Sequence, residues 1–318
     1  MARDRSRRDM APPEESRLME QLDRYGLRHI LGEDLEAVAP FLRFAPPGHF
    51  YSPIPNLRDV ERDAKRIFDR SATSVPGIDL NEQGQREVFI ELSAILSDWA
   101  FPKERGPDYR YFSGPDNTNY GIGDGMILHA AMRRFRPKRV IEIGSGFSSC
   151  MILDTNERFL DGSAELTFIE PHPGLLYSFL PAGEREGTRV LERRLQDVPT
   201  NVFGRLQADD LLFIDSTHVA RVGSDVCDIF ARVLPALETD VIVHFHDVFW
   251  PFEYPKHWIQ EGRAWTELYV LRSFLQFNPS FEILLFNDYL ANVHRDVIAT
   301  RLPRMLENTG GALWLRRR

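Results

Sequence analysis

The stretch VIEIGSGFSS, residues 140–149, joins a run of apolar residues to two glycines and then to small polar residues. An apolar run followed by glycines is typical of a buried strand that enters a tight turn, where the backbone can approach a ligand closely. We expect a helix to begin at about Ser148, so that its free backbone N–H groups face the same ligand. A Gly-x-Gly turn alone is a weak signal, and a purely structural turn is the alternative. Its meaning therefore depends on the segments around it.

Short apolar runs recur after this stretch and alternate with helical patterns. They are RVIEI (139–143), LTFIE (166–170), RVLE (189–192), DLLFID (210–215) and DVIVHF (240–245). This alternation is typical of a parallel sheet that is covered by helices on both faces. After a helical pattern near 258–277 come FEILLF (281–286) and GALWLR (311–316), which can pair antiparallel at one sheet edge. The sequence therefore predicts an α/β fold with a Rossmann-like, seven-stranded sheet that is parallel except for an antiparallel edge hairpin.

The composition restricts the classes of function. Among the 318 residues, 39 Lys and Arg stand against 47 Asp and Glu, which gives a formal net charge of −8. Nucleic acids and anionic membranes need a basic surface, so neither is expected as a partner. The two cysteines are too few for a disulfide framework, and no apolar run approaches the ~20 residues that span a bilayer. The charged N-terminus does not resemble a secretory signal, so we predict a cytoplasmic protein.

The residues before the sheet differ in character from those that follow. Residues 1–14 have the composition of a disordered, charged tail, and helices are expected near 17–31, 58–70 and 84–98. The proline-rich segment 40–57 cannot be regular helix, and it is either a strap over the core or one wall of a substrate pocket. We predict that residues 15–118 form a mostly helical N-terminal cap and that residues 119–318 form the domain that contains the sheet.

Polar residues also follow the second and third predicted strands. Glu170 ends the second strand, where a carboxylate can accept hydrogen bonds from both hydroxyls of a ribose. Gln196 and Asp197 follow the third strand, where a polar side chain can meet an adenine amino group. Each feature alone is equally consistent with a solvated loop. Their order at the ends of three consecutive strands predicts a nucleoside ligand at the carboxyl edge of the sheet.

The motif EIGSGFSS, an acidic end to the second strand and Gln-Asp after the third resemble the class I S-adenosylmethionine-dependent methyltransferases over residues 120–318. Ser149 stands where a nicotinamide-binding fold has a third glycine, which favours this family over a dinucleotide one. The family's sheet also ends in an antiparallel hairpin. The resemblance implies S-adenosylmethionine as cofactor, with the binding residues Glu142, Gly144, Gly146, Ser148, Glu170, Gln196 and Asp197.

A second polar group follows the fourth and fifth predicted strands. Asp215 ends the fourth strand with His218 three residues later, and His246 and Asp247 end the fifth. Adjacent parallel strands lie about 4.8 Å apart, so these side chains can converge beside the nucleoside site. Their oxygen-rich chemistry suits Mg²⁺ or Mn²⁺ better than zinc.

This arrangement is most similar to the metal-dependent O-methyltransferases that act on sugar hydroxyls of macrolide antibiotics. The similarity implies Asp215, His246 and Asp247 as metal ligands, and His218 as a general base that acts in catalysis together with Asp215. That family has an acid where His246 stands, which puts the metal in doubt for this chain. The alternatives are a buried, hydrogen-bonded histidine at 246 and a capping or loop histidine at 218.

Together these patterns predict an enzyme that transfers a methyl group from S-adenosylmethionine to a hydroxyl of a small molecule or a sugar. One alternative is a metal-dependent hydrolase that uses the Asp/His cluster, which leaves Gly144, Gly146 and Glu170 without a role. Another is a non-catalytic module that binds the cofactor. The partner is thus expected to be a small-molecule or glycosyl acceptor. The sequence is also compatible with a homo-oligomer.

Overall fold

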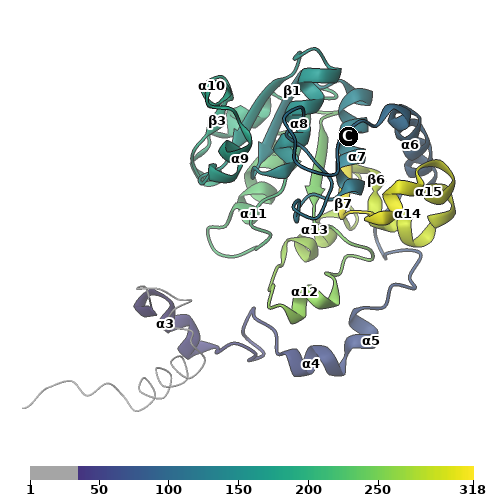
Figure 1. The fold of residues 1–318 in the computed structure, drawn as a ribbon. Helices are drawn as coiled ribbons and strands as arrows, with labels where there is room; N and C mark the ends of the chain where they lie inside the picture. Colours follow the sequence, from purple (N-terminus) through teal and green to yellow (C-terminus); the bar gives the residue numbers. More distant parts are fainter. Residues whose placement is uncertain (1–34) are drawn as a thin grey trace, which may run out of the picture. The chain divides into compact units, whose positions relative to one another are not determined.

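The computed structural model describes residues 35–318, which form two compact units that divide between Asp63 and Ala64 (Figure 1). The first described unit contains α3 (Leu35–Phe44) and α4 (Leu57–Arg62). The expected tail at 1–14 and helix at 17–31 lie outside the described residues. The prediction that 40–57 contains no helix was wrong at its start, because α3 includes Pro40. Pro40 removes only one backbone N–H donor from the helix, whereas the two consecutive prolines Pro46 and Pro47 prevent the helix from continuing.

The second unit is built on one seven-stranded sheet with the order β3-β2-β1-β4-β5-β7-β6. Strands β1 to β5 pair in parallel, and β7 runs antiparallel to both β5 and β6. This confirms the predicted Rossmann-like sheet with its antiparallel edge. The strands are β1 (Arg139–Ile143), β2 (Glu165–Ile169), β3 (Val190–Leu191), β4 (Leu211–Ile214), β5 (Ile242–His246), β6 (Phe281–Phe286) and β7 (Ala312–Arg317).

Helices flank this sheet (Figure 1). The helices of the second unit are α5 (Ala64–Ile67), α6 (Glu82–Ile95), α7 (Ile122–Phe135), α8 (Phe147–Phe159), α9 (Gly174–Phe179), α10 (Ala182–Arg185), α11 (Asp225–Asp228), α12 (Lys256–Gln260), α13 (Glu267–Leu275), α14 (Asn287–Val293) and α15 (Arg295–Arg301). The single helix expected near 258–277 is two helices, α12 and α13, with Gly262 at a positive φ of 94° between them. The described residues contain no helix with both the length and the apolarity to cross a bilayer.

The centre of the sheet explains where polar residues can gather. Every side chain of β4 and β5 is buried, as expected for central parallel strands covered on both faces. Ile143 at the end of β1 pairs with Ile169 of β2 and Ile214 of β4. The residues directly after these strands therefore meet at one edge of the sheet.

Helix α6 shows how the segment before the sheet is attached. Its Gln85 is fully buried, donates a hydrogen bond to the Leu80 carbonyl and accepts one from the Phe286 backbone N–H at 2.8 Å. Helix α6 thus packs on strand β6 within the second unit. The role of residues 15–118 as a cap over the acceptor stays a prediction.

Candidate active site

The glycine turn after β1 has a backbone that only glycine adopts without strain. Gly144 has a φ of +85°, and a Cβ at this position would lie 1.8 Å from the carbonyl oxygen of Asp215. Its N–H donates to the Ile169 carbonyl at 3.0 Å, and the Asp215 N–H donates to the Ile143 carbonyl at 2.9 Å. The turn therefore allows the ends of three strands to approach one another closely.

Glu142 and the two serines at the start of α8 brace this turn from within. The Ser148 and Ser149 hydroxyls donate to the two oxygens of the fully buried Glu142 carboxyl, each at 2.5 Å. The Ser149 hydroxyl also accepts a hydrogen bond from the Gly146 N–H at 3.0 Å. Burial raises the pKa of Glu142 to about 8. Ser149, which replaces a third glycine, thus has a structural function here.

A smaller cavity of about 330 Å³ opens at the carboxyl edge of the sheet, and Gly144, Glu170, Gln196 and Asp215 are among its lining residues. The Glu170 carboxylate accepts hydrogen bonds from the backbone N–H groups of Ser145 at 3.3 Å and His172 at 2.7 Å. The buried hydroxyl of Ser145 has no hydrogen-bond partner. The structure therefore brings the ends of β1, β2 and β4 together around one space.

The remaining predicted cofactor residues lie away from this space. Asp197 forms an ion pair with Arg194 at 3.0 Å and is not one of the residues that line the smaller cavity. Glu142, Gly146 and Ser148 do not line it either. Of the two predicted residues after the third strand, Gln196 therefore lines the cavity and Asp197 does not.

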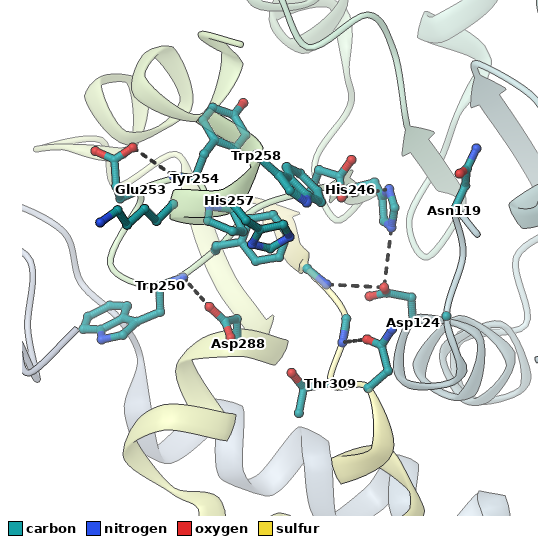
Figure 2. Close-up of a pocket in the computed structure, with 18 of the residues that line it drawn as sticks. Asn119, Asp124, His246, Trp250, Glu253, Tyr254, His257, Trp258, Asp288 and Thr309 are labelled. Carbon is teal, nitrogen blue, oxygen red and sulfur yellow. Dashed lines mark hydrogen bonds and ion pairs between the residues drawn. The ribbon is translucent and has the colours of Figure 1, made fainter. Parts of the chain in front are cut away.

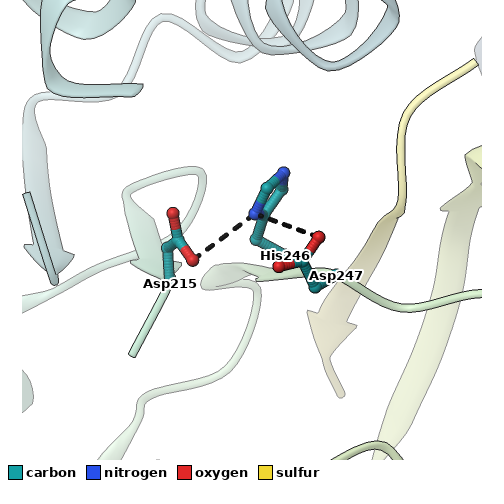
Figure 3. Close-up of side chains that lie close together, drawn as sticks. All are labelled: Asp215, His246 and Asp247. Carbon is teal, nitrogen blue, oxygen red and sulfur yellow. Dashed lines mark ion pairs between the residues drawn. The ribbon is translucent and has the colours of Figure 1, made fainter. Parts of the chain in front are cut away.

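Asp215, His246 and Asp247 form a compact cluster at the ends of β4 and β5 (Figure 3). One donor atom from each lies within 4.8 Å of the others, and among the described residues this is the one such group of three or more. The His246 Nδ1 lies 3.4 Å from Asp215 Oδ1 and 3.7 Å from Asp247 Oδ1. His246 is 4% exposed, and its Nδ1 has no hydrogen-bond partner.

His218 faces the same two carboxylates from the loop after β4. Its Nε2 lies 3.3 Å from Asp215 Oδ1 and 3.5 Å from Asp247 Oδ2, and its Nδ1 lies 2.8 Å from Glu267 Oε2. The Thr266 and Glu267 backbone N–H groups donate to the His218 carbonyl. The start of α13 therefore holds both the ring and the backbone of His218, which has a positive φ of 59°.

Two buried acids that the sequence analysis missed stand behind the two histidines. Asp124 on α7 lies 3.5 Å from His246 Nε2, and Glu267 on α13 contacts His218 as described. Both acids lie far from the strand ends in the sequence and belong to no motif. The one sequence signal for Asp124 is a single acid within the otherwise apolar first turns of the helix 122–135.

The charges of the cluster shift the pKa values of its members in opposite directions. Burial lowers the pKa of His218, but hydrogen bonds with Asp215 and Glu267 outweigh it and raise the value to about 10. Burial likewise lowers the pKa of His246, and the charges of Asp247 and Asp215 raise it well above the usual range. Burial raises the pKa of Asp215, but both histidines hold it well below its ordinary value. In the absence of another cation, protons on the histidines thus balance the carboxylates.

A larger cavity of about 530 Å³ lies beside His246 (Figure 2). Its lining includes the polar residues His246, Asp247 and Asp124 and an aromatic group that follows β5 directly. The aromatic group consists of Phe249, Trp250, Tyr254 and Trp258, and amide side chains come from Asn117, Asn119 and Asn308. Asp215 lines the smaller cavity, so the cluster stands where the two cavities approach each other.

Part of this chain is similar in sequence to known proteins. Residues 141–248 match the family model described as "Methyltransferase domain". Over 169 residues the chain is 31% identical to an uncharacterized protein of Archaeoglobus fulgidus, which covers 51% of this chain and 73% of that protein.

The chain is similar to the SAH-bound Podospora anserina methyltransferase PaMTH1, with 16% identity, a TM-score of 0.43 and coverage of 84% of this chain and 99% of that chain. It is also similar to the Streptomyces achromogenes O-methyltransferase TomG, with 17% identity, a TM-score of 0.33 and coverage of 72% and 87%.

Proposed function

This chain carries a class I, S-adenosylmethionine-dependent methyltransferase domain, and from that premise we propose that it methylates a hydroxyl oxygen of a small molecule or a sugar. One observation carries this proposal. Asp215 lines the smaller cavity and His246 and Asp247 line the larger one, while the Asp215–His246 contact joins the two at 3.4 Å. A polar cluster between two cavities can act on a hydroxyl that approaches a second ligand.

We place S-adenosylmethionine in the smaller cavity, where it would supply an electrophilic methyl group on a sulfonium. Gly144 lines this cavity at the turn, and Glu170 offers carboxylate oxygens for ribose hydroxyls. The buried hydroxyl of Ser216, which lines the same cavity and has no hydrogen-bond partner, fits a polar ligand there. In this proposal Gln196 contacts the cofactor, whereas Glu142, Gly146 and Ser148 hold the turn in shape.

We place the acceptor in the larger cavity, whose volume of about 530 Å³ suits a small molecule. Its aromatic wall offers apolar contact, and its amide side chains offer hydrogen bonds to a polyhydroxylated compound. The net charge of −8 favours a neutral or cationic acceptor over a polyanion. The same acidic balance argues against a nucleic-acid partner.

Asp215, His246 and Asp247 would hold a divalent cation, and Mg²⁺ or Mn²⁺ is expected from the sequence. The residues fit this role because the unpartnered His246 Nδ1 is buried and directed at both carboxylates. A cation there would lower the pKa of a nearby hydroxyl.

His218 is our candidate for the base that takes the hydroxyl proton. Its Nδ1 contacts Glu267, and its Nε2 faces Asp215 and Asp247, whose charges favour a proton on this nitrogen. A cation that neutralised these two carboxylates would lower the pKa of His218 and leave Nε2 free to take the hydroxyl proton.

The test measures cofactor binding and methyl transfer separately. Calorimetry with S-adenosylmethionine should show binding to the wild type and to His218→Ala, while transfer of labelled methyl to hydroxyl acceptors falls about 10²–10⁴-fold in the variant. His129→Ala is the control, because it removes an equally buried imidazole that lines neither cavity. Absence of cofactor binding would contradict the proposed function, and unchanged turnover in His218→Ala would remove this residue from the mechanism.

A further inference from the structure

The cluster offers one nitrogen donor, from His246, beside two carboxylates, from Asp215 and Asp247. His246 is 4% exposed and its Nδ1 has no hydrogen-bond partner. This atom faces Asp215 Oδ1 at 3.4 Å and Asp247 Oδ1 at 3.7 Å. A buried nitrogen that faces two carboxylates either carries a proton or binds a cation, and a metal ion is a ligand that all three groups can share.

Asp124 fixes which nitrogen of His246 faces the carboxylates. Its Oδ2 lies 3.5 Å from His246 Nε2 (Figure 2), whereas Asp215 and Asp247 face the other ring nitrogen, Nδ1. The Gly311 backbone N–H and the Asn287 side-chain amide each donate to the Asp124 carboxylate at 3.3 Å. A Cβ at Gly310 would lie 2.1 Å from Asp124 Oδ1, so the loop leaves room for the acid only because it has glycine there. The loop before β7 and Asn287 of α14 thus hold Asp124 in place.

A carboxylate behind a metal-binding histidine orients the ring and makes the other nitrogen a stronger donor. Asp124 is 4% exposed, so water competes little for this contact. The arrangement therefore belongs to the structure of the site and is not an incidental surface pair.

We propose that the cluster selects a first-row transition-metal ion, in the series from Mn²⁺ to Zn²⁺, over Mg²⁺, and that the Asp124–His246 pair makes this selection. The inference rests on the cation site of the proposed function and names its occupant. Imidazole nitrogen suits Fe²⁺, Ni²⁺, Cu²⁺ and Zn²⁺ best, and Mn²⁺ is the weakest binder of the series, whereas Mg²⁺ prefers oxygen ligands.

The first test measures binding of the metal ions alone to the full chain. Calorimetry with MnCl₂ and with MgCl₂, without S-adenosylmethionine, should show Mn²⁺ binding at least about tenfold more tightly. His246→Asn places an amide oxygen near the position of Nδ1 and should reduce this ratio severalfold. Asp124→Asn should weaken Mn²⁺ binding about 10–100-fold and change Mg²⁺ binding little. His257→Asn changes another histidine that lines the larger cavity, and it should leave the ratio unchanged.

The second test detects the nitrogen ligand directly. Pulsed electron paramagnetic resonance of the Mn²⁺-loaded wild type should show a coupling to ¹⁴N that is absent in His246→Asn and present in His218→Asn. Equal affinities for Mn²⁺ and Mg²⁺, or a ratio that His246→Asn leaves unchanged, would overturn the inference. If His246→Asn does not fold, the wild type decides, because a spectrum without ¹⁴N coupling would overturn it as well.

The two proposals fail in different ways. Methyl transfer without a nitrogen-ligated metal would contradict this inference and leave the proposed function intact. Binding of Mn²⁺ through His246 in a chain that binds no S-adenosylmethionine would contradict the proposed function alone.

Discussion

Gly144 combines a positive φ of 85° with the 1.8 Å approach of the Asp215 carbonyl to its missing Cβ. Gly144→Ala should therefore lower the free energy of unfolding by more than about 2 kcal/mol and abolish cofactor binding. Gly162→Ala is the matched control, since Gly162 also has a positive φ, 67°, but nothing lies within 4 Å of its added Cβ. The free energy of unfolding of that variant, measured with urea, should fall by only about 1 kcal/mol. Equal losses in the two variants would show that the close approach is not the cause.

Glu142 should make stability depend on pH. Burial raises its pKa from 4.5 to about 8 in the folded chain, so folding favours the protonated form. The contribution of Glu142 to the free energy of unfolding is therefore fully present below about pH 4.5, and it is lost as the pH rises through about 8. Glu142→Gln does not titrate, so its stability relative to the wild type should increase by about 2–5 kcal/mol between pH 5 and pH 9.

Urea unfolding at several pH values measures this difference. The exposed Glu87→Gln is the control, and its stability relative to the wild type should stay nearly constant over the same range. If the stability difference between Glu142→Gln and the wild type stayed constant with pH, the pKa of the buried Glu142 carboxyl would not be raised by folding.

At the scale of single residues, the sequence predicted which side chains meet where polar residues stand at or directly after the end of a strand. The approach of His218, His246 and Asp247 to Asp215 could be predicted because parallel strands end at a common edge. Their roles remain proposals. Asp124 and Glu267 could not be predicted, since helices bring them to the site from positions that no local pattern marks.

At the scale of elements, Gln85 joins α6 to the edge strand β6. Its amide satisfies the buried Leu80 carbonyl and the Phe286 N–H. Gln85→Ala should lower the free energy of unfolding by about 2–4 kcal/mol, because two buried backbone groups lose their partners. Gln83→Ala, on the exposed side of the same helix, should change it by less than about 0.5 kcal/mol. Chemical unfolding of both variants tests this, and similar losses would contradict the proposed anchor.

The strands were predicted more accurately than the helices. The expected runs at 139–143 and 281–286 coincide with β1 and β6, because buried strands are short, apolar and bounded by polar residues. The helix expected at 58–70 is instead α4 and α5, in two different units. Helical periodicity does not show where a chain leaves one compact unit and enters another.

For the whole molecule, two boundaries lie at different places in the chain. The sequence changes character at about residue 119, whereas the two compact units divide between Asp63 and Ala64. The first marks where strands begin, because a change in periodicity is visible in the sequence. The second depends on long-range packing such as that of α6 on β6, which periodicity does not encode. Part of the chain before residue 119, from Ala64 onward, therefore belongs to the same compact unit as the sheet.

The aromatic residues after β5 give the molecule an internal optical reporter. Of the five tryptophans, Trp250 and Trp258 line the larger cavity, and Trp265 packs against the His218 ring with centroids 4.4 Å apart. Intrinsic fluorescence therefore originates largely around the space that we assign to the acceptor. Candidate acceptors can be screened by the change in this emission without a label, without turnover and before any product is known.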